Sequence, residues 1–122
     1  MDISEQVSSM KYYSEDESRE IKLAFENEVM NWSQVSTKKM FGCPCYRVNN
    51  RLFAFLVTKG VVITHLGKTD KGQLSQEYQL DFFDTGTRKI GNWPQISFRS
   101  VEELKAIIPY VKKSYERALY EK

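Results

Sequence analysis

The sequence contains two cysteines and one histidine, and these side chains are the ones best suited to carry chemistry. A cysteine beside a histidine can act as a nucleophile, and the same side chains are zinc ligands. We expect two-residue hairpin turns at 49–50 and at 59–60. With these turns, Cys45 lies opposite Ala54, and Ala54 lies opposite His65. The two reactive side chains would then approach each other across a small alanine.

A structural role for the cysteines is the favoured interpretation. Cysteine is among the most frequently buried residue types, and on a sheet face it packs as a small hydrophobic side chain. A structural zinc ion needs four ligands, and the Cys43-Pro44-Cys45 spacing differs from that of a zinc knuckle. We therefore predict no catalytic, cofactor-binding or metal-binding residue, and no cofactor. A Cys-His enzyme or metal site involving His65 is the weaker alternative.

Basic side chains that lie near the predicted hairpin ends, or that are paired in sequence, are the candidates for contact with a polyanion. The chain has 18 basic and 16 acidic residues, but six of the acidic ones fall within residues 1–20, so the body that follows is mildly basic. DNA or polyanion binding is therefore an alternative function, and it requires the candidate charges to cluster on one face. Trp93 is the best candidate for an exposed ring that stacks on a base. The candidate charges are Lys38, Lys39, Arg47 and Arg51.

Two amphipathic helices are predicted, one near each end of the chain. Ser14, with a glutamate three residues later, is typical of a capping box, and apolar residues then recur at helical spacing. Ser100 with Glu103 forms a second such box. The helix after it should kink or restart at Pro109, because proline cannot donate a backbone hydrogen bond. The residues predicted to pack on the sheet are Phe25, Trp32, Leu104, Ile108, Val111 and Tyr115.

Between these helices the apolar period changes to two, which indicates β-strands. A helical turn is expected at 70–76. The predicted fold class is α+β, a two-layer domain in which an antiparallel sheet of four or five strands packs with N-terminal and C-terminal helices. Residues 14–122 should form this single domain, and residues 1–13 a flexible N-terminal segment. The predicted strands are 38–48, 51–58, 61–66, 80–84 and 88–99.

Two stretches carry a family resemblance, Lys39-Met40-Phe41-Gly42 and Tyr46-Arg47-Val48-Asn49-Asn50-Arg51-Leu52-Phe53-Ala54. They resemble the opening of the TfoX (Sxy) N-terminal domain, which has a Met-Phe-Gly strand, a turn, and a second strand that carries Phe-Ala. The later order of a third strand, a short helix, weaker strands and a proline-containing C-terminal helix is also similar, over residues 20–120. YjbR-like domains are the nearest alternative family.

The resemblance implies a cytoplasmic, non-catalytic domain. We expect a small regulatory or protein-interaction module, without the C-terminal domain of full-length competence regulators, and not an enzyme. Its partner would be an unidentified protein or a second copy of the chain. The longest apolar run, 52–57, is too short to cross a bilayer, and the N-terminal residues do not read as a signal peptide. We therefore expect a cytoplasmic location and no membrane contact.

Overall fold

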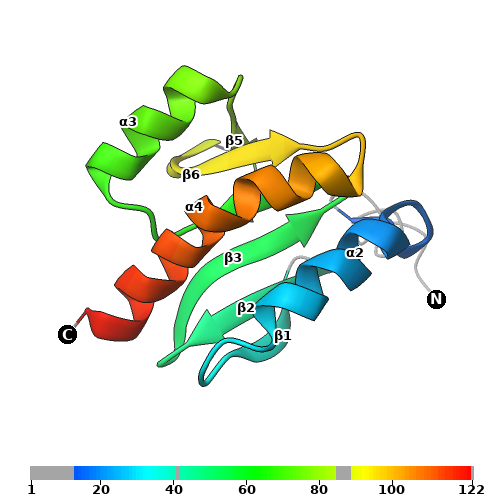
Figure 1. Cartoon of the computed structure of the whole chain (residues 1–122), viewed down its shortest axis with the longest axis horizontal. Helices are drawn as coiled ribbons and strands as arrows, with labels where there is room; N and C mark the ends of the chain where they lie inside the picture. The colour runs from blue at the N-terminus through cyan, green and yellow to red at the C-terminus, as the bar shows by residue number, and fades with distance from the viewer. Residues whose placement is uncertain (1–12, 41, 85–88, 122) are drawn as a thin grey trace.

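The computed structural model describes residues 13–40, 42–84 and 89–121, and they form an α+β fold (Figure 1). One six-stranded antiparallel sheet has the order β1-β2-β3-β4-β6-β5. Helices α2 and α4 lie across the same face of this sheet, and α3 lies beside α4. The elements are α2 (Glu15–Val29), β1 (Ser36–Met40), β2 (Cys43–Val48), β3 (Arg51–Val57), β4 (Gly60–Ile63), α3 (Lys68–Glu77), β5 (Asp81–Asp84), β6 (Lys89–Ser97) and α4 (Val101–Tyr120).

The predicted N-terminal segment 1–13 is described only at its last residue. Tyr13 is buried, and its hydroxyl donates a hydrogen bond to Glu15 Oε1 at 3.2 Å. Residues 1–12 lie outside the described ranges. Tyr13 therefore packs with the described fold.

The predicted strand 38–48 is in fact two strands. In the β1–β2 hairpin the last pair is Met40 and Cys43. Gly42 has a φ of 76°, in the left-handed region that glycine adopts without steric penalty, and this lets the chain reverse. The sheet therefore has six strands rather than four or five, and β1 forms one of its two edges.

The β2–β3 hairpin turns at 49–50 as predicted, with both asparagines at positive φ. A register shift then follows within the strand pair, between Tyr46 and Arg47. This irregularity moves the pairing by one residue, so that Cys45 lies opposite Phe55 rather than Ala54. A shift of one residue also places Cys45 and Ala54 on opposite faces of the sheet.

The β3–β4 turn is made by residues 58–59, one position earlier than predicted. As a result, Ala54 lies opposite Ile63, and His65 lies in the connection after β4. The predicted row of Cys45, Ala54 and His65 is wrong, because the β2–β3 pair contains a register shift and the β3–β4 turn lies one position earlier than predicted.

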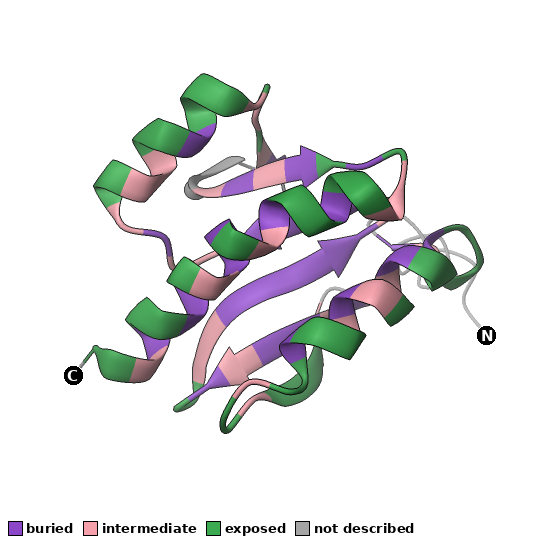
Figure 2. Cartoon of the chain, in the orientation of Figure 1, coloured by how far each residue is buried: buried purple, intermediate pink, exposed green. Residues whose placement is uncertain are grey.

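The two faces of the sheet are covered in different ways. Directly opposed residues of antiparallel strands share a face, so Tyr46 and Ala54 lie on one side and Cys45 and Phe55 on the other. The helices cover the first side, where the rings of Phe25 on α2 and Tyr46 lie 4.8 Å apart. Figure 2 shows that both helices turn their buried residues toward the sheet.

Curling of the sheet closes the face that carries the cysteines. The rings of Phe55 on β3 and Phe83 on β5 lie 4.9 Å apart, although β4 and β6 separate these strands in the sheet. In a flat sheet, three strand spacings would hold them roughly 14 Å apart. The half-buried Trp93 joins the cluster, 5.7 Å from Phe55. The prediction of an exposed Trp93 ring is therefore wrong, because the curled sheet packs it against phenylalanines.

Helix α2 begins after Ser14 as predicted, although the serine side chain makes no capping hydrogen bond. Instead, the backbone N–H of Ser14 donates to Thr58 Oγ1 at 2.8 Å and fixes the helix start on the β3–β4 turn. The helix ends at Val29, so Trp32 lies beyond it.

None of the helices in the described ranges combines the length and apolar character that a transmembrane span requires.

Helix α4 runs unbroken through Pro109, so the predicted restart there is wrong. Its start is as predicted, because Ser100 Oγ accepts the N–H of Glu103 at 3.3 Å. The buried face is rotated from the predicted one: Ile107 is fully buried, whereas Ile108 is half-buried. Among the residues predicted to pack on the sheet, those that are buried are Phe25, Leu104, Val111 and Tyr115, and those half-buried are Trp32 and Ile108.

Small residues let α4 approach β3 closely. Ser114 and Ala118 are both fully buried on the helix. Ser114 Oγ donates to the carbonyl oxygen of Phe53 at 2.7 Å and accepts the backbone N–H of His65 at 3.0 Å. One hydroxyl thus joins the helix, the central strand and the end of β4.

Candidate interaction surface

The four predicted basic candidates lie on the first three strands, but they do not form one cluster. Lys38 and Lys39 are exposed on β1, and Arg47 is half-buried on β2. Lys38 on β1 lies opposite Cys45 on β2, so these two residues share a face of the sheet. Arg47 is two positions after Cys45 on β2 and therefore lies on that face as well. Lys39 points to the opposite face. The structure therefore brings Lys38 and Arg47 to one side and Lys39 to the other side of the same edge.

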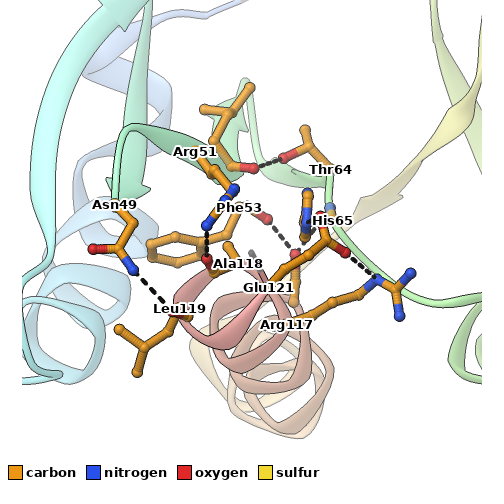
Figure 3. A network of polar contacts seen from close by, with 11 residues as sticks. Asn49, Arg51, Phe53, Thr64, His65, Arg117, Ala118, Leu119 and Glu121 are labelled. Atoms are coloured by element: carbon orange, nitrogen blue, oxygen red, sulfur yellow. Dashed lines mark hydrogen bonds and ion pairs between the residues drawn. The ribbon is translucent and has the colours of Figure 1, made fainter.

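Arg51 is used within the fold. Its Nη1 donates to the carbonyl oxygen of Ala118 at 2.9 Å, and Asn49 Nδ2 donates to that of Leu119 at 2.8 Å (Figure 3). These are among the last carbonyls of α4, which have no partner inside the helix. A cation is also favourable at a helix C-terminus. We therefore assign Arg51 to capping of α4 and no longer count it among the candidates for contact with a partner.

The basic strands belong to a long stretch of sequence without acidic residues. Between Glu28 and Asp70 there is no aspartate or glutamate, whereas there are six lysines and arginines. This stretch contains β1 to β4 in full. Acidic residues flank the stretch on both sides, so the net charge of the body as a whole does not reveal it.

Strand β1 combines this charge with an open backbone edge. It pairs only with β2 in the sheet, and Ser36, Thr37, Lys38 and Lys39 are all exposed (Figure 2). Within the described ranges, no backbone hydrogen bond from another segment reaches its outer side. Edge strands present unpaired N–H and C=O groups that can pair with another chain. β1 is therefore a basic surface with backbone groups available for pairing.

The cysteines and the histidine lie on opposite sides of the sheet. Cys43 and Cys45 are buried on the curled side. Burial raises the pKa of Cys43 to about 12, with a further contribution from Cys45. Burial likewise raises the pKa of Cys45 to about 11, and the hydrogen bond to the Met40 carbonyl and the charges of Arg47 and Lys38 offset only part of this effect. Both thiols are thus protonated at neutral pH, which does not favour a nucleophile.

His65 belongs instead to a network at the end of α4 (Figure 3). Its Nε2 lies 3.1 Å from Glu121 Oε1, and Arg117 Nε lies 3.6 Å from Glu121 Oε2. Within residues 13–40, 42–84 and 89–121, no three His, Cys, Asp or Glu side chains lie close enough together to hold a metal ion. We therefore assign His65 to the attachment of the helix end.

A hollow of about 770 Å³ lies between α4 and the segment that joins α2 to β1. Its aromatic and polar groups already contact one another. Lys112 Nζ lies 4.7 Å from the centroid of the Trp32 ring, and the Tyr115 hydroxyl donates to the carbonyl oxygen of Ser33 at 2.8 Å. These contacts give the hollow a structural role, and β1 remains the stronger candidate surface.

Comparisons with known proteins identify no relative of this chain. A scan against protein-family models finds no match for the chain. Searches among curated proteins and among solved structures also find no significant match. The resemblance to the TfoX and YjbR-like domains stays a prediction.

Proposed function

We propose that this chain is a small, non-catalytic protein-interaction module, regulatory in its effect, that recognises an acidic partner through β1 and β2. The observation that carries the proposal is the exposed, basic edge strand within the acid-free stretch 29–69. Opposite charges across an interface steer association and suppress wrong partners. Lys38, Lys39 and Arg47 are the residues that we expect to contact the partner.

The chemistry of the cysteines supports a binding role over an enzymatic one. Cys43 and Cys45 are buried thiols held in the protonated form, and His65 lies on the other side of the sheet. Reduced cysteines also agree with a reducing compartment, and we propose a cytoplasmic location. We retain the TfoX N-terminal domain as the proposed family, on the resemblance in the segment from β1 to β3.

A quantitative pull-down from cell extract tests this function. The baits are the unaltered chain, the double variant Lys38→Glu with Lys39→Glu, and a matched variant Arg99→Glu with Lys105→Glu. The matched variant reverses two exposed charges elsewhere on the molecule. We expect a specific partner that is recovered by the unaltered and matched chains and lost from the β1 variant. Equal recovery by all three chains would contradict the proposal.

DNA or another polyanion is the second candidate, because the same acid-free strands attract phosphates. Binding to duplex and single-stranded DNA should be titrated over a range of salt concentrations. Micromolar affinity that weakens steeply with salt, and that is lost on reversal of Lys38 and Arg47, would favour this candidate. Arg51 is unsuitable for that test, since its replacement also removes a contact to the end of α4.

A further inference from the structure

We propose that β1 binds its partner by strand addition, taking an extended acidic segment as a seventh strand of the sheet. This inference rests on the proposed function and adds the conformation and chemistry of the bound segment. It comes from two features of the same strand, the direction of its backbone groups and the placement of its lysines. Both follow from the register of the β1–β2 hairpin.

The backbone groups that face outward belong to Thr37 and Lys39. In an antiparallel pair, hydrogen-bonded and non-hydrogen-bonded positions alternate. Met40 and Cys43 flank the two-residue reversal, where the closing pair is the hydrogen-bonded one. Met40, Lys38 and Ser36 therefore direct their N–H and C=O groups toward β2. The alternate residues, Thr37 and Lys39, direct theirs to the open side, ready to bond an added strand.

The lysines select the charge of that strand. Lys38 and Lys39 are adjacent, so they project from opposite faces of β1. An added strand places one residue directly opposite each lysine, and opposite charges at such positions are favourable. Arg47, on the Lys38 side, adds a third positive charge next to the edge. The segment that fits best has two neighbouring acidic residues in an extended conformation.

The same lysines disfavour a second copy of this chain as the added strand. If two β1 strands paired antiparallel about Lys38, the two Lys38 side chains would lie directly opposite each other. Pairing about Lys39 has the same consequence, and like charges at opposed positions are destabilising. Lysines on edge strands commonly prevent self-pairing in this way. β1 is thus protected from its own copies and open to an acidic strand.

Binding of synthetic peptides, measured by calorimetry, tests the inference. The probe is an eight-residue peptide with two adjacent glutamates flanked by valine and threonine. One control peptide replaces the glutamates by glutamines, and another keeps the glutamates but carries a central proline that cannot pair as a strand. The protein variants are Thr37→Pro, which removes an outward N–H without a change in charge, and Thr37→Ala, which keeps it. Proline is tolerated on an edge strand when its nitrogen faces solvent.

We expect the glutamate peptide to bind the unaltered chain and Thr37→Ala equally, and to bind Thr37→Pro about tenfold more weakly. Both control peptides should bind more weakly than the probe. Hydrogen exchange should show that the amides of Thr37 and Lys39 become protected when the peptide binds. This last measurement uses the unaltered chain, so it decides the matter even if Thr37→Pro fails to fold.

Four results would overturn strand addition. If Thr37→Pro and the proline peptide bind as well as the originals while Lys38→Glu with Lys39→Glu does not bind, the partner docks on side chains alone, and the proposed function stands. If no variant alters binding, or if the probe fails to bind while DNA binds, the proposed function fails as well. If the chain forms oligomers through β1 in sedimentation experiments, a second copy is the occupant.

Discussion

In the central strand β3, five of seven residues are buried, whereas in the edge strand β1 four of five are exposed. The two strands belong to one sheet and are separated only by β2. β3 contacts a helix on one face and the aromatic cluster on the other. β1 carries two exposed lysines and an open backbone. We therefore expect the stability of the fold to depend on the centre of this sheet, and substitutions on its edge to leave the fold intact.

The largest expected effect separates these two strands directly. Phe55→Ala should lower the free energy of unfolding by about 3–5 kcal/mol, because it empties the contact between the two halves of the curled sheet. Lys38→Ala on β1 should change it by less than about 0.5 kcal/mol. Urea denaturation measures both. Similar values for the two variants would show that β1 contributes to the core after all.

A smaller effect is expected where α4 attaches to the central strand. Ser114→Ala should lower the free energy of unfolding by about 1–3 kcal/mol, since the Phe53 carbonyl and the His65 N–H both lose a buried partner. Ser75→Ala is the matched control, because that hydroxyl bonds Gly72 on the exposed side of α3. In the same denaturation experiment, the free energy of unfolding of Ser75→Ala should stay within about 0.5 kcal/mol of the value for the unaltered chain. An equal loss for both serines would argue against the proposed attachment.

The smallest effect concerns the buried thiols on the curled side. An unfolded Cys43 loses its proton around pH 9.0, whereas the folded residue keeps it up to a pKa of about 12. The contribution of the buried Cys43 thiol to the free energy of unfolding is therefore fully present below pH 9. It decreases as the pH rises from 9 to 12. Between pH 8 and 10 the loss should be about 1 kcal/mol per thiol.

Thermal or urea unfolding of the unaltered chain and of Cys43→Ala, compared at pH 8 and pH 10, measures this loss. Between pH 8 and pH 10, the free energy of unfolding should decrease less for Cys43→Ala than for the unaltered chain, whatever the stability of the variant at pH 8. Identical decreases would mean that Cys43 is accessible to water in the folded chain. The tyrosines also begin to titrate near pH 10 in the unfolded chain, but they are the same in both proteins, so the difference between the two decreases reports the Cys43 thiol.

The helices and the β2–β3 turn follow from local rules that the sequence contains. Asparagines at 49–50 tolerate positive φ, and Ser100 caps α4 through its own side chain. The rotation of α4 does not follow from such rules. Ile107 and Ile108 are chemically identical neighbours, so apolar periodicity cannot tell which of them faces the sheet. Burial of Ser114 and Ala118 decides it, and this depends on close contact with β3.

The candidate surface was predictable in its residues but not in its position. Lys38 and Lys39 stand out as paired charges, and the absence of acids in 29–69 can be counted. Their place on a sheet edge depends on the reversal at Gly42, which splits one apparent strand into two. The register shift between Tyr46 and Arg47 was equally hidden. Apolar residues occupy both faces of β3, so alternation does not fix the register.

The hydrogen bonds from the β2–β3 turn to α4 also constrain the order of folding. Asn49 and Leu119 are 70 positions apart in the chain, and Arg51 and Ala118 are 67 apart. Contacts between such distant residues slow folding, because a long loop must close before they form. During synthesis α4 follows every strand, so a ribosome-bound chain that has reached β6 still exposes the apolar face around Ala54. We expect this nascent intermediate to need a chaperone until α4 emerges and covers it.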